Sequence, residues 1–269
     1  MYLGIDIGGT KTLAAVFSDE GALEEQIKFP TPKKYDEFLQ ELTKTIRSFK
    51  TQDFRAGCVA APGALDRPRG RVINFGNLPW TNVPLLKNVE TISHCPMLLE
   101  NDAKLAGLGE AVLLKEDRVL YVTISTGIGY GLVVGRVIES GLSDAGGRNM
   151  MLEHHGKLVP WESYASGSAI VQRFGKRASE IDDAETWKTI TRDLVPGFLE
   201  LIAILHPEII VIGGGVGHYL EKFHDSLVDG LKRYETPMLK IPPIVEAQRP
   251  DEAVIYGCYD LARDTYLPK

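Results

Sequence analysis

Cysteine is scarce in this sequence of 269 residues. Cys58, Cys95 and Cys258 are the only three, and they lie far apart along the chain. An odd number at this spacing argues against a disulfide framework and provides no C-x-x-C metal pair. Free cysteines are typical of a reducing compartment, so we expect a cytoplasmic protein.

Long apolar runs and an excess of basic charge are also missing. No run approaches the roughly 20 apolar residues that a membrane-spanning helix needs, and no basic segment followed by an apolar block marks a secretory signal. The formal net charge is −6, from 30 Lys and Arg against 36 Asp and Glu. This balance disfavours nucleic acid and membrane surfaces as partners, and we expect neither.

The remaining composition is that of an ordinary globular protein, with 44% hydrophobic and 25% charged residues. Residues 2–7 predict a strand, Gly8-Gly9 a turn, and residues 12–17 the second strand of a hairpin. Residues 119–137 repeat the pattern of strand, glycine turn and strand. Two lobes of related architecture explain the repeat, although unrelated glycine hairpins are a common alternative.

Apolar periodicity predicts the other elements. Strands are expected at 22–29, 55–61, 97–100 and 209–212; helices are expected at 34–49, from Asn101 or Asp102 to Ala111, up to Leu205, at about 219–234 and at 251–263. The Pro/Gly/Arg-rich stretch 62–71 predicts a loop or a β-excursion.

The segment Asp6-Ile-Gly-Gly-Thr-Lys11 is suited to phosphate. Gly8 and Gly9 let several backbone N–H groups face one point, which makes an anion nest. Thr10 adds a hydroxyl and Lys11 a positive charge. Asp6, at the strand end, can hold Mg²⁺, which takes one or two carboxylates plus phosphates. The alternative is a plain hairpin turn.

Two later glycine segments follow the same logic. Thr126-Gly127 lies in the turn of the second hairpin, and Gly214-Gly215 follows the strand at 209–212. The first suits phosphates and the second allows close approach of an adenine or ribose. Either one alone is also compatible with an ordinary turn.

Polar residues suited to a polyol occur at three places. Asp102 at a helix start stays ionised in the positive end of the helix dipole and can accept the proton of an attacking hydroxyl; the alternative role is an N-cap. Asn101 can fix neighbouring hydroxyls. Glu162 can bind sugar hydroxyls or be a solvated surface residue. The loop around Asn77 suits a polyol, or is a structured loop around a core Trp80.

His154 and His155 are adjacent in a segment predicted to be extended. Neighbours in a strand point to opposite faces, so the two are a poor chelating pair. One of them can still hydrogen-bond a substrate.

In this order, the motifs resemble the ROK family of sugar kinases, in the actin-like/hexokinase-like ATPase superfamily. The matching segments are Asp6–Lys11, Ala61–Gly63, Asn77–Trp80, Glu100–Lys104 with Gly107, Thr126–Gly129, Glu162–Gly167 and Ile212–Gly215. They span nearly the whole chain, and their combination is far more specific than any single glycine turn.

The resemblance implies an α/β fold of two ribonuclease-H-like lobes with a cleft between them. Residues 1–117 would form the N-terminal lobe and residues 118–269 the C-terminal lobe, with the last helix a candidate to pack at the lobe junction. The implied activity is an ATP-dependent hexose kinase acting on a primary hydroxyl, the 6-hydroxyl, of a sugar such as glucose. A homodimer is expected because dimers are common in the family.

The resemblance also implies site roles. Asp102 would be the general base, Asn101 and Glu162 would hold sugar hydroxyls, and the turns at Gly8 and Gly127 would hold phosphates. We further expect Asp6 to hold magnesium, and Gly63, Asn77 and His155 to contact the sugar. The other expected ATP-binding residues are Gly9, Thr10, Lys11, Thr126, Gly214 and Gly215.

The sequence departs from the family at one segment. Typical members carry Glu-x-Gly-His and then a cysteine-rich zinc loop before the residue matching Glu162. No cysteine lies between Cys95 and Cys258, so no structural zinc is expected. The sugar contact in residues 144–155 stays open among Asp144, Glu153, His154 and His155.

Three alternatives to an ATP-dependent kinase remain open. Some short relatives without the zinc loop use polyphosphate as donor. Sugar-responsive regulators of the family carry a helix-turn-helix domain before the first strand, whereas this sequence begins at that strand. A filament-forming ATPase is disfavoured by the sugar-type segments at Glu100–Asp102 and Trp161–Glu162.

Overall fold

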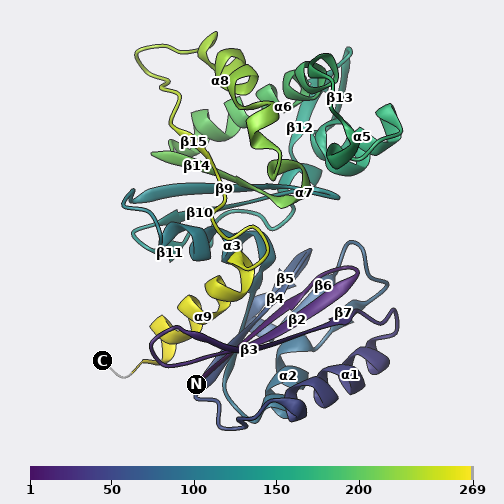
Figure 1. Ribbon diagram of the computed structural model, residues 1–269, viewed down its shortest axis with the longest axis vertical. Helices are drawn as coiled ribbons and strands as arrows, with labels where there is room; N and C mark the ends of the chain where they lie inside the picture. The colour runs from purple at the N-terminus through teal and green to yellow at the C-terminus, as the bar shows by residue number, and fades with distance from the viewer. Residues whose placement is uncertain (268–269) are drawn as a thin grey trace. The chain divides into compact units, whose positions relative to one another are not determined.

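The computed structural model describes residues 1–267, which fall into two compact units (Figure 1). Unit 1 contains Met1–Gly109 and the segment that starts at Asp251; unit 2 contains Glu110–Pro250. A five-stranded sheet forms the centre of each unit.

The central sheet of unit 1 has the order β3-β2-β1-β4-β8. Its strands are β1 (Tyr2–Ile7), β2 (Lys11–Phe17), β3 (Leu23–Pro30), β4 (Ala56–Ala61) and β8 (Met97–Asn101). Neighbouring strands are antiparallel in β1, β2 and β3, and β4 runs parallel to both β1 and β8. The register pairs Asp6 with Ala60 and Ala60 with Glu100, so Asp6 and the end of β8 lie at the same edge of the sheet.

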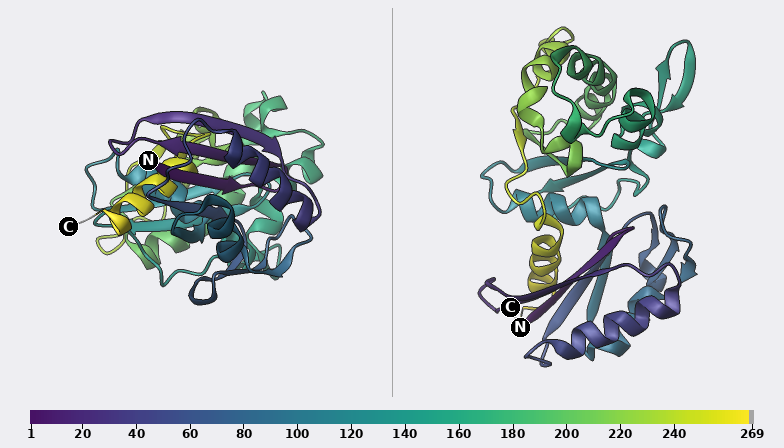
Figure 2. Two further views of the ribbon diagram at one scale, coloured as in Figure 1. Left: turned by 90° about the horizontal axis from the view of Figure 1, so that it is seen from below. Right: turned by 45° about the vertical axis from the view of Figure 1, so that its right-hand side comes forward.

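Helices cover both faces of this sheet (Figure 2). They are α1 (Tyr35–Ser48), α2 (Leu85–Ser93), α3 (Asp102–Ala111) and α9 (Ala253–Tyr266). The buried residues Phe38, Leu42 and Ile46 recur at helical spacing and place α1 in one core. On the opposite face a Cβ added at Gly4 would lie 3.4 Å from the Cβ of Cys258, so α9 packs closely there.

A small antiparallel sheet of order β5-β6-β7 follows β4. Its strands are β5 (Ala64–Asp66), β6 (Arg71–Asn74) and β7 (Thr81–Val83), with the 3₁₀ helix η1 (Arg67–Arg69) between the first two. The predicted β-excursion at 62–71 is therefore confirmed.

Unit 2 has a central sheet of order β11-β10-β9-β14-β15 and a separate hairpin of β12 and β13. The strands are β9 (Arg118–Ile124), β10 (Ile128–Val134), β11 (Val137–Ile138), β12 (Met151–His154), β13 (Lys157–Pro160), β14 (Ile209–Gly213) and β15 (Ile244–Glu246). The helices are α4 (Glu162–Ala165), α5 (Gly167–Phe174), α6 (Ala184–Leu205), α7 (Gly214–Gly217) and α8 (His224–Lys232), with short 3₁₀ helices at Gly146–Arg148, Ala178–Glu180 and Leu220–Lys222.

The central sheets of the two units have the same order and strand directions. As in unit 1, the first three strands of the second sheet are antiparallel, and the two that follow are parallel. The core residues Val122 and Ile212 of this sheet pack with Leu194 and Phe198 of α6. The interpretation of two related lobes is thus confirmed.

Two expected boundaries differ from the structure. The last helix was expected within residues 118–269, but α9 packs on β1 and β4 and belongs to unit 1. Gly4 of β1 allows the close approach to the sheet, since it lies against Ile255 and Cys258. Gly257 of α9 lies against the backbone of Leu105 in α3. The helix expected at about 219–234 begins only at His224, because a separate 3₁₀ turn at Leu220–Lys222 precedes it.

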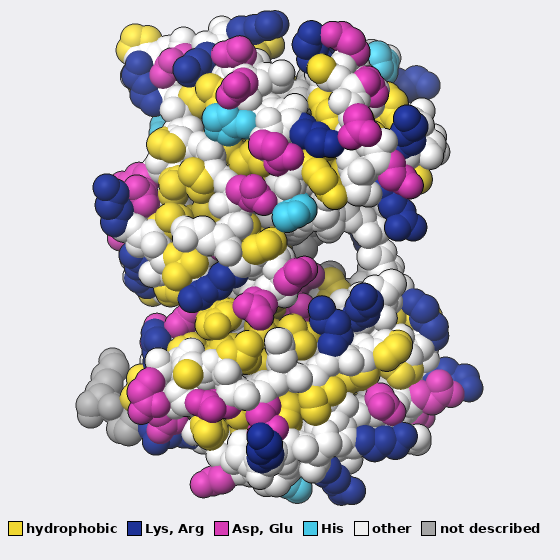
Figure 3. Space-filling view, viewed as in Figure 1, with side chains coloured by type: hydrophobic (Ala, Val, Ile, Leu, Met, Phe, Trp, Pro, Cys, Tyr) yellow, Lys and Arg dark blue, Asp and Glu magenta, His cyan; other side chains and the backbone are white. Residues whose placement is uncertain are grey.

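Within residues 1–267, no helix has both the length and the apolarity to cross a membrane. Acidic and basic side chains are interspersed on the face of the molecule that Figure 3 shows. Neither sign of charge dominates that face.

Candidate active site

The first glycine turn joins β1 to β2 in unit 1. The N–H of Gly8 donates to the carbonyl of Lys11 at 2.9 Å, and a Cβ at Gly8 would lie only 2.8 Å from that oxygen. Thr31 braces the turn, since its hydroxyl donates to the carbonyl of Gly8 at 2.8 Å and its N–H to the carbonyl of Thr10 at 3.0 Å. Thr10 and Lys11 are exposed, so the turn presents a hydroxyl and a cation to solvent.

Two carboxylates lie close together beside this turn. Burial, and then the negative charge of Asp102, raise the pKa of Asp6 from its ordinary 3.8 to about 7. Asp102 is the first residue of α3. Its carboxylate accepts the N–H of Ala103 at 2.8 Å. The arrangement concentrates negative charge where a divalent cation would be favoured.

Asn101 supplies the cap of α3. Its side-chain oxygen accepts the N–H groups of Ala103 at 3.1 Å and Lys104 at 3.2 Å. The sequence left Asn101 and Asp102 open as capping residues, and this geometry favours Asn101. Asn101 is buried, and its amide NH₂ is the part left to donate to a hydroxyl.

Arg67 of η1 was missed by the sequence reasoning. Its Nε donates to Glu100 Oε2 at 2.9 Å and its Nη2 to Glu100 Oε1, a bidentate pair. Glu100 is buried, and it directly precedes Asn101 and Asp102. The pair therefore ties the 62–71 excursion to the segment that bears Asp102. A single arginine in a loop gave no sequence signal for this contact.

Two other predicted sugar residues lie in unit 1. The Cβ of Asn77 would be 3.1 Å from a Cβ added at Gly9, so Asn77 is in contact with the first glycine turn. Gly63 has φ +91° and lies against the carbonyl of Asn74, which requires glycine for steric reasons. Trp80 is buried among Phe38 and Phe75, so the interpretation of a core tryptophan is confirmed.

The second glycine turn joins β9 to β10 in unit 2 and contacts Glu162. The Glu162 carboxylate accepts the N–H of Ile128 at 2.9 Å, and a side chain at Gly127 would overlap it. Thr126, beside Gly127, is exposed. The other Glu162 oxygen pairs with the Nε of Arg148 at 3.2 Å, a second arginine that the sequence reasoning missed.

The third glycine segment follows β14. Gly214 has φ +84°, and a Cβ there would lie 2.6 Å from Thr123 Oγ1 and 2.7 Å from the carbonyl of Ile124. Gly214 therefore lies against the end of β9, just before the second turn. A Cβ at Gly215 would meet no atom within 4 Å, which leaves an open backbone surface.

The paired histidines do not have the predicted geometry. His154 ends β12, but His155 has φ +52° and lies exposed in the hairpin turn. Because the chain reverses there, the two rings are in contact, with centroids 4.1 Å apart, and do not point to opposite faces. His154 Nε2 lies 3.3 Å from Asp193 Oδ1. No cluster of three or more metal-ligating side chains occurs in the described part of the chain.

The three cysteines are buried and unpaired in the structure. Burial raises the pKa of the Cys58 thiol well above its ordinary range. Such thiols are poor nucleophiles and serve as small core residues.

The model of the ROK family matches residues 2–265, and the chain belongs to this family. A protein of Bacillus subtilis (strain 168) named "Putative fructokinase" is 32% identical over 236 residues, which are 80% of this chain and 77% of that protein. A glucokinase of Streptomyces coelicolor is 24% identical, with 98% of each chain covered.

Among solved structures, the chain is similar to a ROK family glucokinase from Streptomyces griseus in complex with glucose and AMPPNP. The TM-score is 0.82 at 25% identity, covering 98% of this chain and 99% of that one. The predicted family is thereby confirmed, as is the α/β fold of two ribonuclease-H-like lobes.

Proposed function

We propose that this chain is an ATP-dependent hexose kinase that phosphorylates the 6-hydroxyl of a sugar such as glucose. Membership of the ROK family and similarity to proteins named as a fructokinase and a glucokinase support the reaction class. The observation that carries the proposal is Asp102, which lies beside Asp6 at the sheet edge where the first glycine turn begins.

Asp102 would act as the general base. Its carboxylate takes the proton of the sugar hydroxyl while that oxygen bonds to the γ-phosphorus and the bond from phosphorus to the ADP oxygen breaks. The helix dipole of α3 favours the ionised carboxylate. Phosphoryl transfer needs little covalent help, so positioning and charge stabilisation provide most of the acceleration.

Each unit contributes residues to the proposed binding of sugar and nucleotide. In unit 1, Asn77 and the amide of Asn101 would hydrogen-bond sugar hydroxyls, and the Gly8–Lys11 turn would hold phosphate oxygens. In unit 2, one Glu162 oxygen accepts from Ile128 and the other from Arg148, and each keeps a lone pair that can accept a sugar hydroxyl. Thr126-Gly127 and Gly214-Gly215 would approach the nucleotide. The predicted sugar contacts of Gly63 and His155 stay predictions.

The donor set fits magnesium. Asp6 and Asp102 are two adjacent carboxylates beside an anion nest, and Mg²⁺ favours one or two carboxylates plus phosphates. Asp6 would hold the ion, which supplies charge neutralisation at the phosphates when bound.

Changing Asp6 to Asn should abolish stabilisation by magnesium. In the wild type, ADP with saturating Mg²⁺ should raise the melting temperature above that with ADP and EDTA, because a ligand at 100 times its Kd stabilises by about 2.7 kcal/mol. The Asp6→Asn variant should show the same melting temperature in both mixtures. Asp36→Asn, on the exposed face of α1, is the control and should respond like the wild type. An undiminished response in Asp6→Asn would remove Asp6 as the magnesium residue.

A sugar panel tests the function. Glucose, mannose, fructose, allose and the N-acetylated hexosamines are each mixed with the protein, Mg²⁺ and ATP, and separately with polyphosphate. We expect ADP release that depends on at least one hexose, with a 6-phosphate product by NMR. If the sugar is phosphorylated with polyphosphate and not with ATP, the donor is polyphosphate. No sugar-dependent transfer from either donor would reject the kinase proposal and leave a sugar-responsive regulator, to be examined by sugar binding.

A further inference from the structure

Glu162 begins a helix too short to hold its own position. The helix α4 has only four residues, Glu162–Ala165, and helices of this length are not stable by themselves. The location of the Glu162 side chain must therefore come from contacts of the residues on either side of it.

Trp161, just before Glu162, is anchored in α6. Its indole Nε1 donates to the backbone carbonyl of Asp193 at 3.1 Å, and its side chain is fully buried. Pro196 lies inside α6 and lacks an N–H, so the carbonyl of Arg192, the neighbour of Asp193, loses its helix donor in this turn. A side chain at Gly197 would overlap the indole, so the absence of a side chain at this position leaves the space that Trp161 fills.

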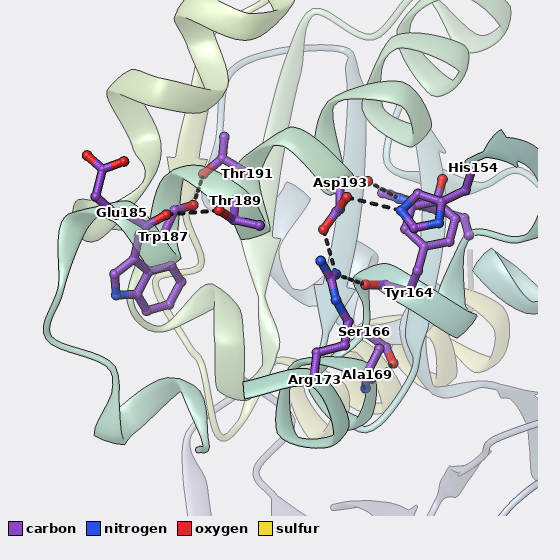
Figure 4. A network of polar contacts seen from close by, with 11 residues as sticks. His154, Tyr164, Ser166, Ala169, Arg173, Glu185, Trp187, Thr189, Thr191 and Asp193 are labelled. Carbon is purple, nitrogen blue, oxygen red and sulfur yellow. Dashed lines mark hydrogen bonds and ion pairs between the residues drawn. The ribbon is translucent and has the colours of Figure 1, made fainter. Parts of the chain in front are cut away.

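Tyr164, two residues after Glu162, is anchored by the side chain of the same aspartate. Asp193 Oδ2 accepts from Arg173 Nη1 at 2.6 Å, and this nitrogen also donates to the carbonyl of Tyr164 at 2.9 Å. Asp193 is 9% exposed and the Arg173 side chain 31%, so the carboxylate end of this ion pair is shielded from water while the arginine is partly solvated. Figure 4 shows Asp193 with Arg173 on one side and His154 on the other.

His154 connects the hairpin of β12 and β13 to Asp193. Its Nε2 lies within hydrogen-bond distance of Asp193 Oδ1, and its ring stacks on Tyr164 with centroids 4.0 Å apart and planes 14° apart. Asp193 thus contacts three groups around Glu162. Its carboxylate binds His154 of the β12–β13 hairpin and Arg173, which in turn binds Tyr164 of α4. Its backbone carbonyl binds Trp161, the residue before Glu162.

We propose that Asp193 is a positioning residue for Glu162. It acts through Trp161 and Arg173, and so sets where the Glu162 carboxylate stands against the N–H of Ile128. Asp193 does not touch the reacting groups in this scheme. The inference rests on the proposed function in one respect, namely that Glu162 binds the sugar.

The test is Asp193→Asn, which keeps the size and the backbone carbonyl but removes the charge that holds Arg173. The KM for the accepted sugar should rise at least fivefold, while kcat and the KM for ATP stay within twofold. Arg173→Gln should have a similar effect, and the double variant should be no worse than either single variant, because both act in one network. Glu200→Gln, an exposed carboxylate on the same helix, is the matched control and should leave all constants unchanged.

The outcomes separate positioning from general stabilisation. A lower melting temperature with unchanged sugar KM, or a fall in kcat with unchanged KM, would overturn the proposal. If the wild type phosphorylates no sugar, the proposed function fails and the positioning is measured by hydrogen exchange. Faster exchange of the amides of residues 161–165 in Asp193→Asn than in Glu200→Gln would then support it, and equal rates would overturn it.

Discussion

Asp102→Asn should lower kcat by about 10²–10⁴, the usual contribution of a positioned general base. Asparagine is nearly isosteric with aspartate, but its amide cannot take a proton from the attacking hydroxyl. The hydroxyl contacts that we propose for Asn77, Asn101 and Glu162 should remain, so sugar affinity measured by calorimetry should stay within about threefold. The rate is measured as sugar-dependent ADP release at saturating ATP.

Folding should not obscure this result. The side-chain oxygen of Asn101 already accepts two N–H groups at the start of α3, so the helix keeps its cap when Asp102 is changed. Asp36→Asn, at the exposed start of α1, is the matched control for the loss of a carboxylate. Turnover in Asp102→Asn close to that of the wild type would show that another group accepts the proton.

Gly257→Ala should destabilise the protein by about 3 kcal/mol, at the upper end of the usual cost of overpacking. A Cβ at Gly257 would overlap the backbone carbonyl of Leu105 in α3, and α3 would have to move away from α9. Gly109 makes a similar approach, because a Cβ there would also overlap the carbonyl of Ala253, so the two helices meet through two glycines. A backbone oxygen cannot rotate aside as the end of a side chain can. Equilibrium unfolding in urea, followed by circular dichroism, measures the loss.

Gly230→Ala is the control for this prediction. Gly230 also lies inside a helix, but the nearest atom to a Cβ there would be Cγ2 of Val195, at 2.7 Å, and that side-chain methyl group can shift. Alanine also favours the helix by about 1 kcal/mol over glycine, which offsets the contact. Equal stability losses in the two variants would show that the contact between α3 and α9 carries no special cost.

Local patterns in the sequence were sufficient to predict most helices and strands and to select the candidate site residues. The hairpins at Gly8-Gly9 and Gly127 follow from short apolar runs on both sides of a glycine turn, and α1 follows from Phe38, Leu42 and Ile46 at helical spacing. Asp102 was recognisable because a carboxylate at a helix start is a local feature. Its role as base comes from the family resemblance and remains to be tested.

Contacts between distant segments could not be predicted in this way. The bidentate pair of Arg67 and Glu100 joins residues 33 positions apart, and His154 meets Asp193 across 39 positions. The assumption that His154 and His155 point apart failed because it treated the segment as a continuous strand. His155 adopts a left-handed conformation at the hairpin turn, and that conformation brings the rings together.

The sequence by itself determined the two glycine hairpins, the alternation of strands and helices and the order of the motifs, because each depends on residues adjacent in the chain. Only the tertiary structure decided that α9 belongs to unit 1, that Arg67 pairs with Glu100, and that Asp193 supports the helix of Glu162. These contacts form only after the chain has folded, when groups far apart in sequence become buried together and must satisfy one another's charges and hydrogen bonds.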